Sequence, residues 1–362
     1  DELGIKTQYH YDGKGNLIKK TEGAKVTQYA YDALNRLTEI KDGASNLIAR
    51  YGYDPLNRRI WKEQYRDRAG AALTQAKRTY YLYADEGLIA ESEQDITLNA
   101  DNSVTATGAP SISAQYGLKP GAPFMTGVLF VKTRNSNGAT TYAYYHHDHL
   151  KTPIQATDKW GSIVWSATYE AFGRATITTP KAVVSRPTIN SKLRFPGQIE
   201  DEETGLHYNW HRYYDSEIGR YTTSDPIGLE GGINTYEYAL SSPLVYSDPT
   251  GENPVAAAMQ AVLRAMQAAF LACSGNKVCR CRAIYAAYKA LQKLGCNSND
   301  CPIALAQAAA ASTYAGLRAL YITIGCDSAI PTTRDHPTAA REAVRYAANC
   351  AKHAEKVCCK QR

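Results

Sequence analysis

The feature that most constrains the fold is a short tyrosine-aspartate motif that recurs at almost constant spacing. It occupies Tyr9–Asp12, Tyr29–Asp32 and Tyr51–Asp54, at intervals of 20 and 22 residues. Alternating Tyr favours a half-buried strand, and each Asp is followed three positions later by Gly or Asn, which favours a turn. A single hairpin cannot bury its own face, so the units are expected to stack into a continuous sheet. An ordinary β-sandwich with coincidental repeats is the alternative.

Charge and cysteine divide the chain into two parts. From Glu252 onward there are 14 Lys and Arg against 6 Asp and Glu, a net charge of +8, whereas the preceding residues carry 27 against 29. All nine Cys lie between Cys273 and Cys359. This asymmetry predicts two domains, residues 1–251 and 252–362. With no initiator Met, signal peptide or long uncharged apolar run, we interpret the chain as a piece of a longer protein.

Three later blocks carry a family resemblance. They are Tyr144–Pro153, Glu203–Asp215 and Asp225–Tyr236. Together with the repeats they resemble the YD-repeat proteins of the Rhs and teneurin-like type, and are similar to the Rhs-associated core over roughly residues 1–251. The resemblance implies a hollow β-cocoon of stacked hairpins that encloses a variable toxic tip. The Ser-, Thr- and Gly-rich stretch Thr97–Gly121 fits less well and is expected to be a surface insertion or a long loop.

A cluster of histidines raises the question of a metal. His146, His147 and His149 surround Asp148. Alternate residues of a strand point to opposite faces, so this spacing suits a tetrahedral site poorly. We therefore predict neither a metal nor a cofactor, and we assign the block to the shell. Lys151 stands where the family usually has Gly.

Two Asp-Pro-x-Gly segments end the first part of the chain. Asp225–Gly228 is followed after 19 residues by Asp248–Gly251. By itself this pattern could be two tight turns. The resemblance implies a paired signature in which Asp225 and Asp248 form an aspartyl-protease-like dyad that cuts its own chain. Two close carboxylates suit that chemistry, because one holds a proton while the other deprotonates a water.

The expected cut follows the second segment. In the family the motif usually ends in Gly-Leu and the chain is cut after Leu. Here Gly251 is followed by Glu252 and Asn253. We expect cleavage at the Glu252–Asn253 bond or within a residue or two of it.

The tip is predicted to be a small all-α, cysteine-rich domain. Its composition and loop residues favour four helices, at Val255–Ala272, Val278–Leu294, Ile303–Ile324 and Pro337–Cys359. Zinc-type Cys pairs are missing, so disulfides are expected, although Cys also packs as a small apolar residue. The candidates are Cys273, Cys279, Cys281, Cys296, Cys301, Cys326, Cys350, Cys358 and Cys359. Because nine is odd, at least one thiol stays free or pairs elsewhere.

Polar residues on and before the last predicted helix form the candidate toxic site. They are Asp335, His336, Arg341, Glu342, Arg345 and His353. Glu342, Arg345 and His353 share one helix face. Such a set could cleave RNA without metal, with His or Glu as base and Arg steadying the phosphate. A solvated helix face with Asp335 as a cap is the plain alternative.

The tip is therefore predicted to be a nuclease, with an RNase favoured, because a net charge of +8 suits phosphate binding. The alternative is a membrane-disrupting or pore-forming toxin that acts from the periplasm, through the weakly charged segments Val255–Leu271 and Ile303–Ile324. A structural plug or adhesion module is a third possibility. The resemblance implies secretion and delivery into a target cell, commonly by type VI secretion. It also implies a secretion spike and a cognate immunity protein as partners.

Overall fold

The computed structural model describes residues 6–183, 187–231 and 233–252. These residues divide between two compact units: those up to residue 226, together with 236–251, belong to the first, and those of 227–235, together with Glu252, belong to the second. In the first unit, fourteen strands form one antiparallel sheet in chain order. The strands are β1 (Thr7–Tyr11), β2 (Leu17–Glu22), β3 (Lys25–Tyr31), β4 (Leu37–Asp42), β5 (Leu47–Tyr53), β6 (Arg59–Arg66), β7 (Ala72–Ala84), β8 (Gly87–Leu98), β9 (Val104–Leu118), β10 (Val128–Arg134), β11 (Thr140–His147), β12 (Pro153–Thr157), β13 (Ile163–Tyr169) and β14 (Ala175–Ile177).

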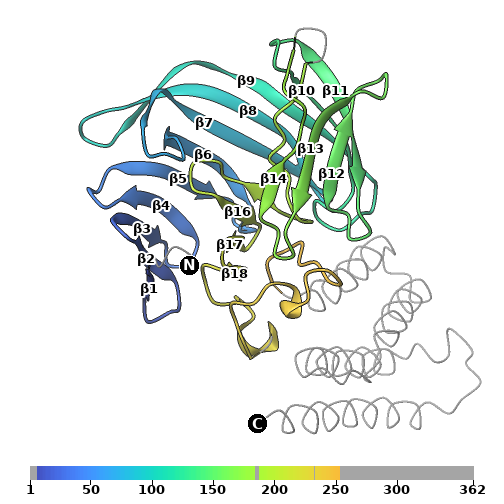
Figure 1. The fold of residues 1–362 in the computed structure, drawn as a ribbon. Helices are drawn as coiled ribbons and strands as arrows, with labels where there is room; N and C mark the ends of the chain where they lie inside the picture. The colour runs from blue at the N-terminus through green and yellow to red at the C-terminus, as the bar shows by residue number, and fades with distance from the viewer. Residues whose placement is uncertain (1–5, 184–186, 232, 253–362) are drawn as a thin grey trace, which may run out of the picture. The chain divides into compact units, whose positions relative to one another are not determined.

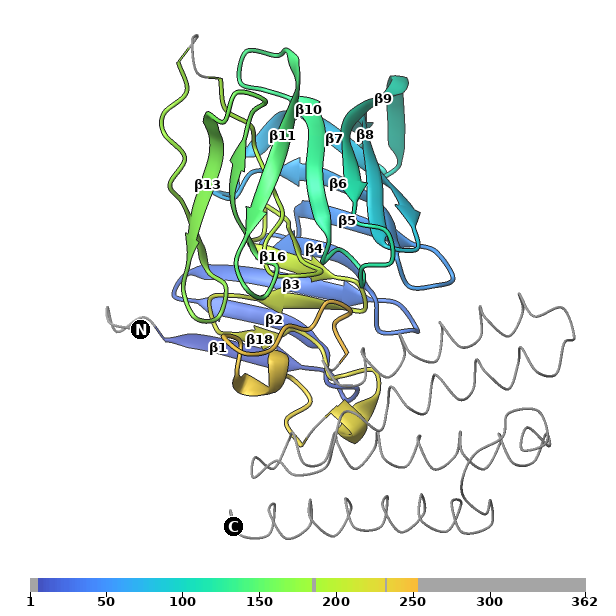
Figure 2. The same ribbon diagram turned by 90° about the vertical axis from the view of Figure 1, so that its right-hand side faces the viewer.

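A second sheet of four strands lies within the curve of the first, as Figures 1 and 2 show. Its strands are β15 (Ile199–Glu200), β16 (Leu206–Asn209), β17 (Arg212–Asp215) and β18 (Arg220–Tyr221). Two 3₁₀ turns follow, η1 (Gly228–Gly231) in the second unit and η2 (Ala239–Ser241) in the first. The predicted β-rich repeat architecture is thus confirmed. The helical tip falls on residues 253–362, outside the described residues. Within the described part of the chain, no helix is long and apolar enough to cross a membrane.

The aspartate of each repeat shapes the hairpin turn. Its Oδ1 accepts the backbone N–H groups two and four residues later at 2.8–3.0 Å, which holds the turn without help from a neighbouring strand. The same arrangement recurs at Asp12, Asp32, Asp42, Asp54, Asp148 and Asp158. The third residue after the Asp has a left-handed φ, 60° at Asn35 and 76° at Lys151. This explains why Gly or Asn is common there.

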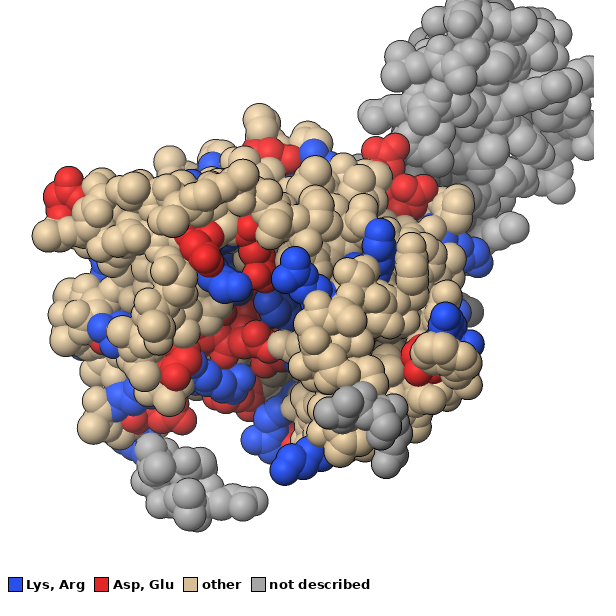
Figure 3. Space-filling view, turned by 90° about the horizontal axis from the view of Figure 1, so that it is seen from above, with Lys and Arg blue, Asp and Glu red and all other residues tan. Residues whose placement is uncertain are grey.

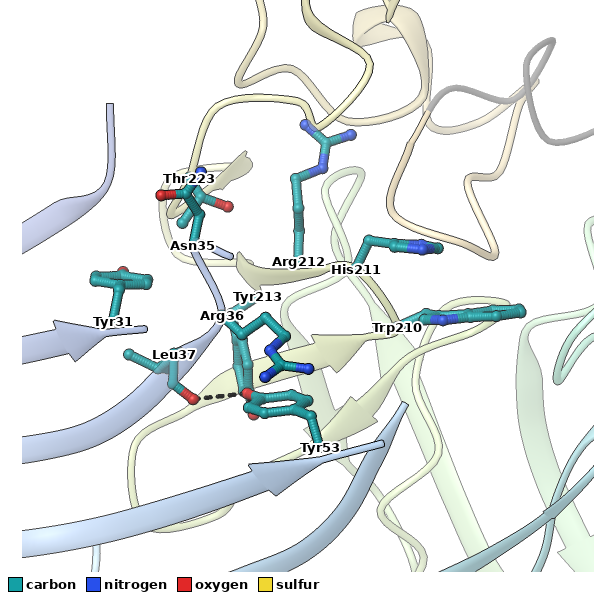
Figure 4. A pocket seen from close by; sticks show the side chains of 10 residues that line it. All are labelled: Tyr31, Asn35, Arg36, Leu37, Tyr53, Trp210, His211, Arg212, Tyr213 and Thr223. Atoms are coloured by element: carbon teal, nitrogen blue, oxygen red, sulfur yellow. Dashed lines mark hydrogen bonds between the residues drawn. The ribbon is translucent and has the colours of Figure 1, made fainter. Parts of the chain in front are cut away.

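The tyrosine of each repeat ties successive hairpins together. Its hydroxyl donates to the carbonyl that lies five residues after the Asp of the preceding unit. The pairs are Tyr31 to Leu17 at 3.0 Å, Tyr53 to Leu37 at 2.7 Å, Tyr83 to Arg59 at 3.0 Å and Tyr169 to Pro153 at 2.9 Å. Figure 4 draws the second of these bonds. Phe cannot make this bond, which favours Tyr over Phe at these four positions.

Where the two sheets meet, apolar and charged side chains are both buried. Leu37, Ile40 and Tyr51 of the large sheet pack on Tyr208 and Tyr213 of the small sheet. On the face seen in Figure 3, acidic and basic side chains gather in a hollow between uncharged surfaces. The small sheet completes an apolar core with the large one, and Asp201, in the loop after β15, pairs with the fully buried Arg59 of β6.

One of the two alternatives expected for Thr97–Gly121, the long loop, is wrong. Thr97–Gly121 is not a long loop, because β8 and β9 extend through most of it as a hairpin with a short turn between Leu98 and Val104. Most of β9 from Val104 to Ser111 is exposed. Backbone pairing with β8 holds this segment, so small and polar side chains suffice there.

Candidate self-cleavage site

The turn between β16 and β17 forms the platform of the candidate site. Asn209 pairs with Arg212 in this hairpin, which leaves Trp210 and His211 as its two-residue turn. Trp210 has a φ of 49°, a left-handed conformation that costs about 1–2 kcal/mol for such a residue. Its ring packs on Phe124 with centroids 4.3 Å apart, and this contact helps to hold the turn. Figure 4 shows Trp210 and His211 extending side by side, while the Arg212 side chain points in another direction.

The second Asp-Pro-x-Gly segment, residues 248–251, lies against this turn and is called the strap here. The backbone N–H of His211 donates to the Thr250 carbonyl at 3.2 Å, and the His211 Nδ1 lies 3.0 Å from the same oxygen. Gly251 has a φ of 70°, and a Cβ at this position would lie 2.3 Å from the Asn209 carbonyl oxygen. Both the conformation and the space therefore require glycine at the end of the strap.

Asp225 and Asp248, the two residues predicted as a dyad, meet at one guanidinium. The Arg212 Nη2 lies 2.8 Å from the Asp225 Oδ2 and 3.4 Å from the Asp248 Oδ2. All three side chains are at least 96% buried. The guanidinium also lies over the Tyr221 ring, 3.6 Å from its centroid. One positive charge thus lets two carboxyl groups approach each other away from water.

Further donors fix the Asp248 carboxyl group. The Tyr221 hydroxyl donates to its Oδ2 at 2.8 Å, and the Gly251 N–H donates to its Oδ1 at 3.0 Å. Burial and the nearby Asp248 charge raise the pKa of Tyr221 well above its usual value, so the phenol keeps the proton that it donates. The Arg212 Nε donates to the Gly251 carbonyl. Arg212 therefore connects both carboxyl groups to the end of the strap.

Of the predicted cut residues, Gly251 and Glu252 are described, and Asn253 lies outside the described residues. The tip residues are also outside them, both the nine cysteines and the set Asp335, His336, Arg341, Glu342, Arg345 and His353.

The histidine cluster has separate partners. The His146 Nε2 lies 2.9 Å from the Thr157 hydroxyl, and the His149 Nε2 lies 3.0 Å from the Leu244 carbonyl. Desolvation and the Lys151 ammonium lower the pKa of His147. In the described ranges, no group of three His, Cys, Asp or Glu side chains could hold a metal ion.

Three side chains of the candidate site were not singled out from the sequence. Asn209 and Arg212 lie within Glu203–Asp215, and Tyr221 ends the short β18. Their partner Asp248 is 27 to 39 residues away along the chain. The only sequence signal was their place inside the block that resembles the Rhs core.

Comparison with known proteins agrees with the repeat architecture and the core block. The family model for the RHS repeat matches residues 11–47, and the model for RHS protein matches residues 143–178. Double-stranded DNA deaminase toxin A of Burkholderia cenocepacia is 32% identical over 67% of this chain and 17% of its own length. Toxin protein Tse5 of Pseudomonas aeruginosa is 32% identical over 67% of this chain and 18% of its own. The tRNA3(Ser)-specific nuclease WapA of Bacillus spizizenii is 30% identical over 67% of this chain and 9% of its own.

A large sheet of repeated hairpins, with a small tyrosine-rich sheet within its curve, is the architecture of a YD-repeat shell. The chain belongs to the Rhs/YD-repeat family and is related to Rhs toxins. It spans less than a fifth of the length of each of these three relatives.

Proposed function

We propose that this chain is the C-terminal part of an Rhs toxin whose shell cuts its own chain and so frees a toxic tip. One observation carries the proposal: Asp225 and Asp248 share the Arg212 guanidinium, and the same Arg212 binds the Gly251 carbonyl. A pair of buried carboxyl groups is thereby set beside the segment to be cut. Because the scissile bond belongs to the same chain, proximity lets a weak catalyst complete its single turnover.

The chemistry requires one proton on the pair. The carboxylate takes a proton from a water molecule as the water oxygen bonds to the scissile carbonyl carbon. The carboxylic acid gives its proton to the amide nitrogen as the C–N bond breaks. A new carboxyl end and a new amino end result, and the pair again holds one proton. Arg212 offsets the repulsion between the two groups and steadies the strap.

The self-cleavage test uses the Asp248→Asn variant, which keeps the size of the side chain and removes the carboxylate. The parent is expected to yield a fragment of about 12 kDa, its share by length of the 39.7 kDa chain. The Asp248→Asn chain is expected to stay intact. Asp158→Asn, a turn aspartate of the β12–β13 hairpin, is the matched control and should be cut like the parent. Equal cutting of Asp248→Asn and the parent would end the assignment.

Mass spectrometry in H₂¹⁸O then locates the bond and tests the mechanism. Hydrolysis places one ¹⁸O in the new carboxyl end, which we expect at Glu252. Cyclisation of the Asn253 side chain would instead leave the new end at Asn253, and this result contradicts the aspartyl mechanism.

For the tip we propose a nuclease, with RNA as the favoured substrate. The net charge of +8 from Glu252 onward supports it. The relatives' printed activities include a DNA deaminase and a tRNA nuclease, so relationship alone does not select the chemistry. A membrane-disrupting tip is the alternative. The cut chain is expected to degrade RNA and to lose this activity with His336→Ala or His353→Ala. Leakage from dye-loaded liposomes that both variants retain would instead support the membrane toxin.

Partners and delivery follow from the same proposal. A toxin of this kind requires a cognate immunity protein, and an acidic surface would suit a tip of this charge. A secretion apparatus or spike component would carry the protein out and into a target cell.

A further inference from the structure

Asn209 is a fully buried amide at the centre of the candidate site. Its exposure is 0%, and its Nδ2 donates at 2.8 Å to the Tyr221 hydroxyl and at 2.8 Å to the Asp248 backbone carbonyl. A carbonyl oxygen only accepts, so the atom that faces it must be the nitrogen. The orientation of the amide is therefore fixed by its surroundings.

The other end of this amide is an acceptor without a donor. Among the described residues, no group donates a hydrogen bond to the Asn209 Oδ1, although the atom is buried. A buried acceptor is costly unless something donates to it, and buried acceptors of this kind are common binding points for ordered water. The acceptor belongs to the same side chain that holds the Asp248 carbonyl. It therefore lies at the reacting groups and not at a remote part of the core.

We propose that the Asn209 Oδ1 holds the water molecule that the Asp225–Asp248 pair activates. This inference rests on the proposed self-cleavage. One O–H of the water donates to Oδ1 and the other faces the ionised carboxyl group of the pair. The water is thus oriented before its second proton moves to the carboxylate and its oxygen bonds to the scissile carbon. The Nδ2 of the same residue fixes the strap through the Asp248 carbonyl, so one side chain aligns nucleophile and substrate.

Two substitutions separate the acceptor from the donor. Asn209→Asp keeps an oxygen at the Oδ1 position and removes the Nδ2 donor. Asn209→Leu keeps the approximate volume and removes both. If Asn209 serves only as an anchor through Nδ2, the two variants should be equally slow. If Oδ1 holds the water, Asn209→Asp should cut measurably faster than Asn209→Leu.

The experiment follows the full chain after cell-free synthesis and measures the fraction cut against time. Asn209→Leu is expected to cut at least about 100-fold more slowly than the parent, the effect of a misplaced reactant. Asn209→Asp is expected to recover much of this loss, with an altered dependence on pH, because a third carboxyl group now adjoins the pair. Asn46→Leu, a surface turn amide, is the control and should cut like the parent.

The outcomes are distinct. Equal slow cutting by Asn209→Asp and Asn209→Leu, or cutting of Asn209→Leu at the parent's rate, overturns the inference and leaves the dyad intact. An uncut parent, or a cut Asp248→Asn chain, overturns the proposed function and the inference with it. A melting curve and resistance to added protease check that each shell folds, and Asn209→Ala replaces the Leu variant if that variant does not.

Discussion

Arg59 of β6 and Asp201 of the loop after β15 form a fully buried ion pair that connects the two sheets. The Arg59 Nη1 lies 2.6 Å from the Asp201 Oδ2, and both side chains are 0% exposed. Lys62 adds a second positive charge 3.0 Å from the Asp201 Oδ1. The Arg59 guanidinium also lies over the Tyr208 ring, 4.4 Å from its centroid, so this cation contacts an aromatic ring of the small sheet as well as the Asp201 carboxylate. The small sheet is thereby positioned on the large sheet by charge as well as by apolar packing.

Removal of one partner should therefore destabilise the shell strongly. Arg59→Met is expected to lower the free energy of unfolding by about 3–5 kcal/mol, because it leaves the buried Asp201 carboxylate without its main partner. Urea unfolding followed by intrinsic fluorescence measures the loss. Arg174→Met is the control, since Arg174 pairs with Glu170 while both are more than half exposed, and it should change little. Equal effects of the two variants would mean that the buried pair does not join the sheets.

The tyrosine bonds between repeats make a second prediction. Tyr53→Phe removes the donor to the Leu37 carbonyl, and this donor also lies 3.1 Å from the Tyr213 hydroxyl. Because the carbonyl remains part-buried, the free energy of unfolding should fall by about 1–2 kcal/mol. Tyr142→Phe, on the exposed side of β11, should change it by less than about 0.5 kcal/mol. Urea midpoints of both variants against the parent decide the question.

The contrast between repeats and site shows how far the sequence alone can lead. The Asp and Tyr of each repeat act within a turn or on the neighbouring hairpin, so their period in the sequence is the period of the sheet. Arg212 contacts Asp248 of the strap, which lies 36 residues further along the chain, only in the folded structure. No local pattern encodes that meeting, and the family resemblance supplied the two aspartates but not their shared arginine.

The same reasoning explains the error at Thr97–Gly121. Its Ser, Thr and Gly content is typical of loops. The segment is nevertheless a strand, because its backbone pairs with that of β8, and such pairing does not depend on apolar side chains. The left-handed φ of Trp210 could not be predicted from the sequence either, because a bulky residue adopts this conformation only where tertiary packing, such as the contact with Phe124, stabilises it.

A third prediction concerns the surface that holds the strap. Gly197 has a φ of 84°, and a Cβ there would lie 2.1 Å from the Pro249 carbonyl oxygen. Gly197→Ala should displace the strap and slow self-cleavage by about 100-fold or more. Gly121→Ala is a matched control, because Gly121 also has a left-handed φ, of 73°, but has nothing within 4 Å of its Cβ position. Both variants bear the backbone cost of about 1–2 kcal/mol, and only the first should lose cutting. Densitometry of cut and uncut chain over time measures the difference, and parallel losses in both variants would contradict it.

The last prediction is a dependence of stability on pH that a single buried histidine sets. Desolvation, with a further contribution from Arg194, lowers the pKa of His207 from its usual 6.5 to about 3. The folded chain therefore holds this imidazole neutral, while the unfolded chain protonates it below about pH 6.5. Between pH 6.5 and 3 the unfolded state binds more protons than the folded state. The contribution of neutral His207 to the stability of the fold is therefore complete above pH 6.5 and falls as the pH is lowered.

The size of the effect is a few kcal/mol at most by pH 3. His207→Asn removes the titration, and its amide can still donate toward the Gln198 Oε1, which accepts from His207 Nδ1 at 2.8 Å. Urea midpoints measured between pH 7.5 and 4 should decline less steeply for His207→Asn than for the parent. His146→Asn, on an exposed histidine, should follow the parent curve. If the two variants decline alike, groups other than His207 control the acid sensitivity of the shell.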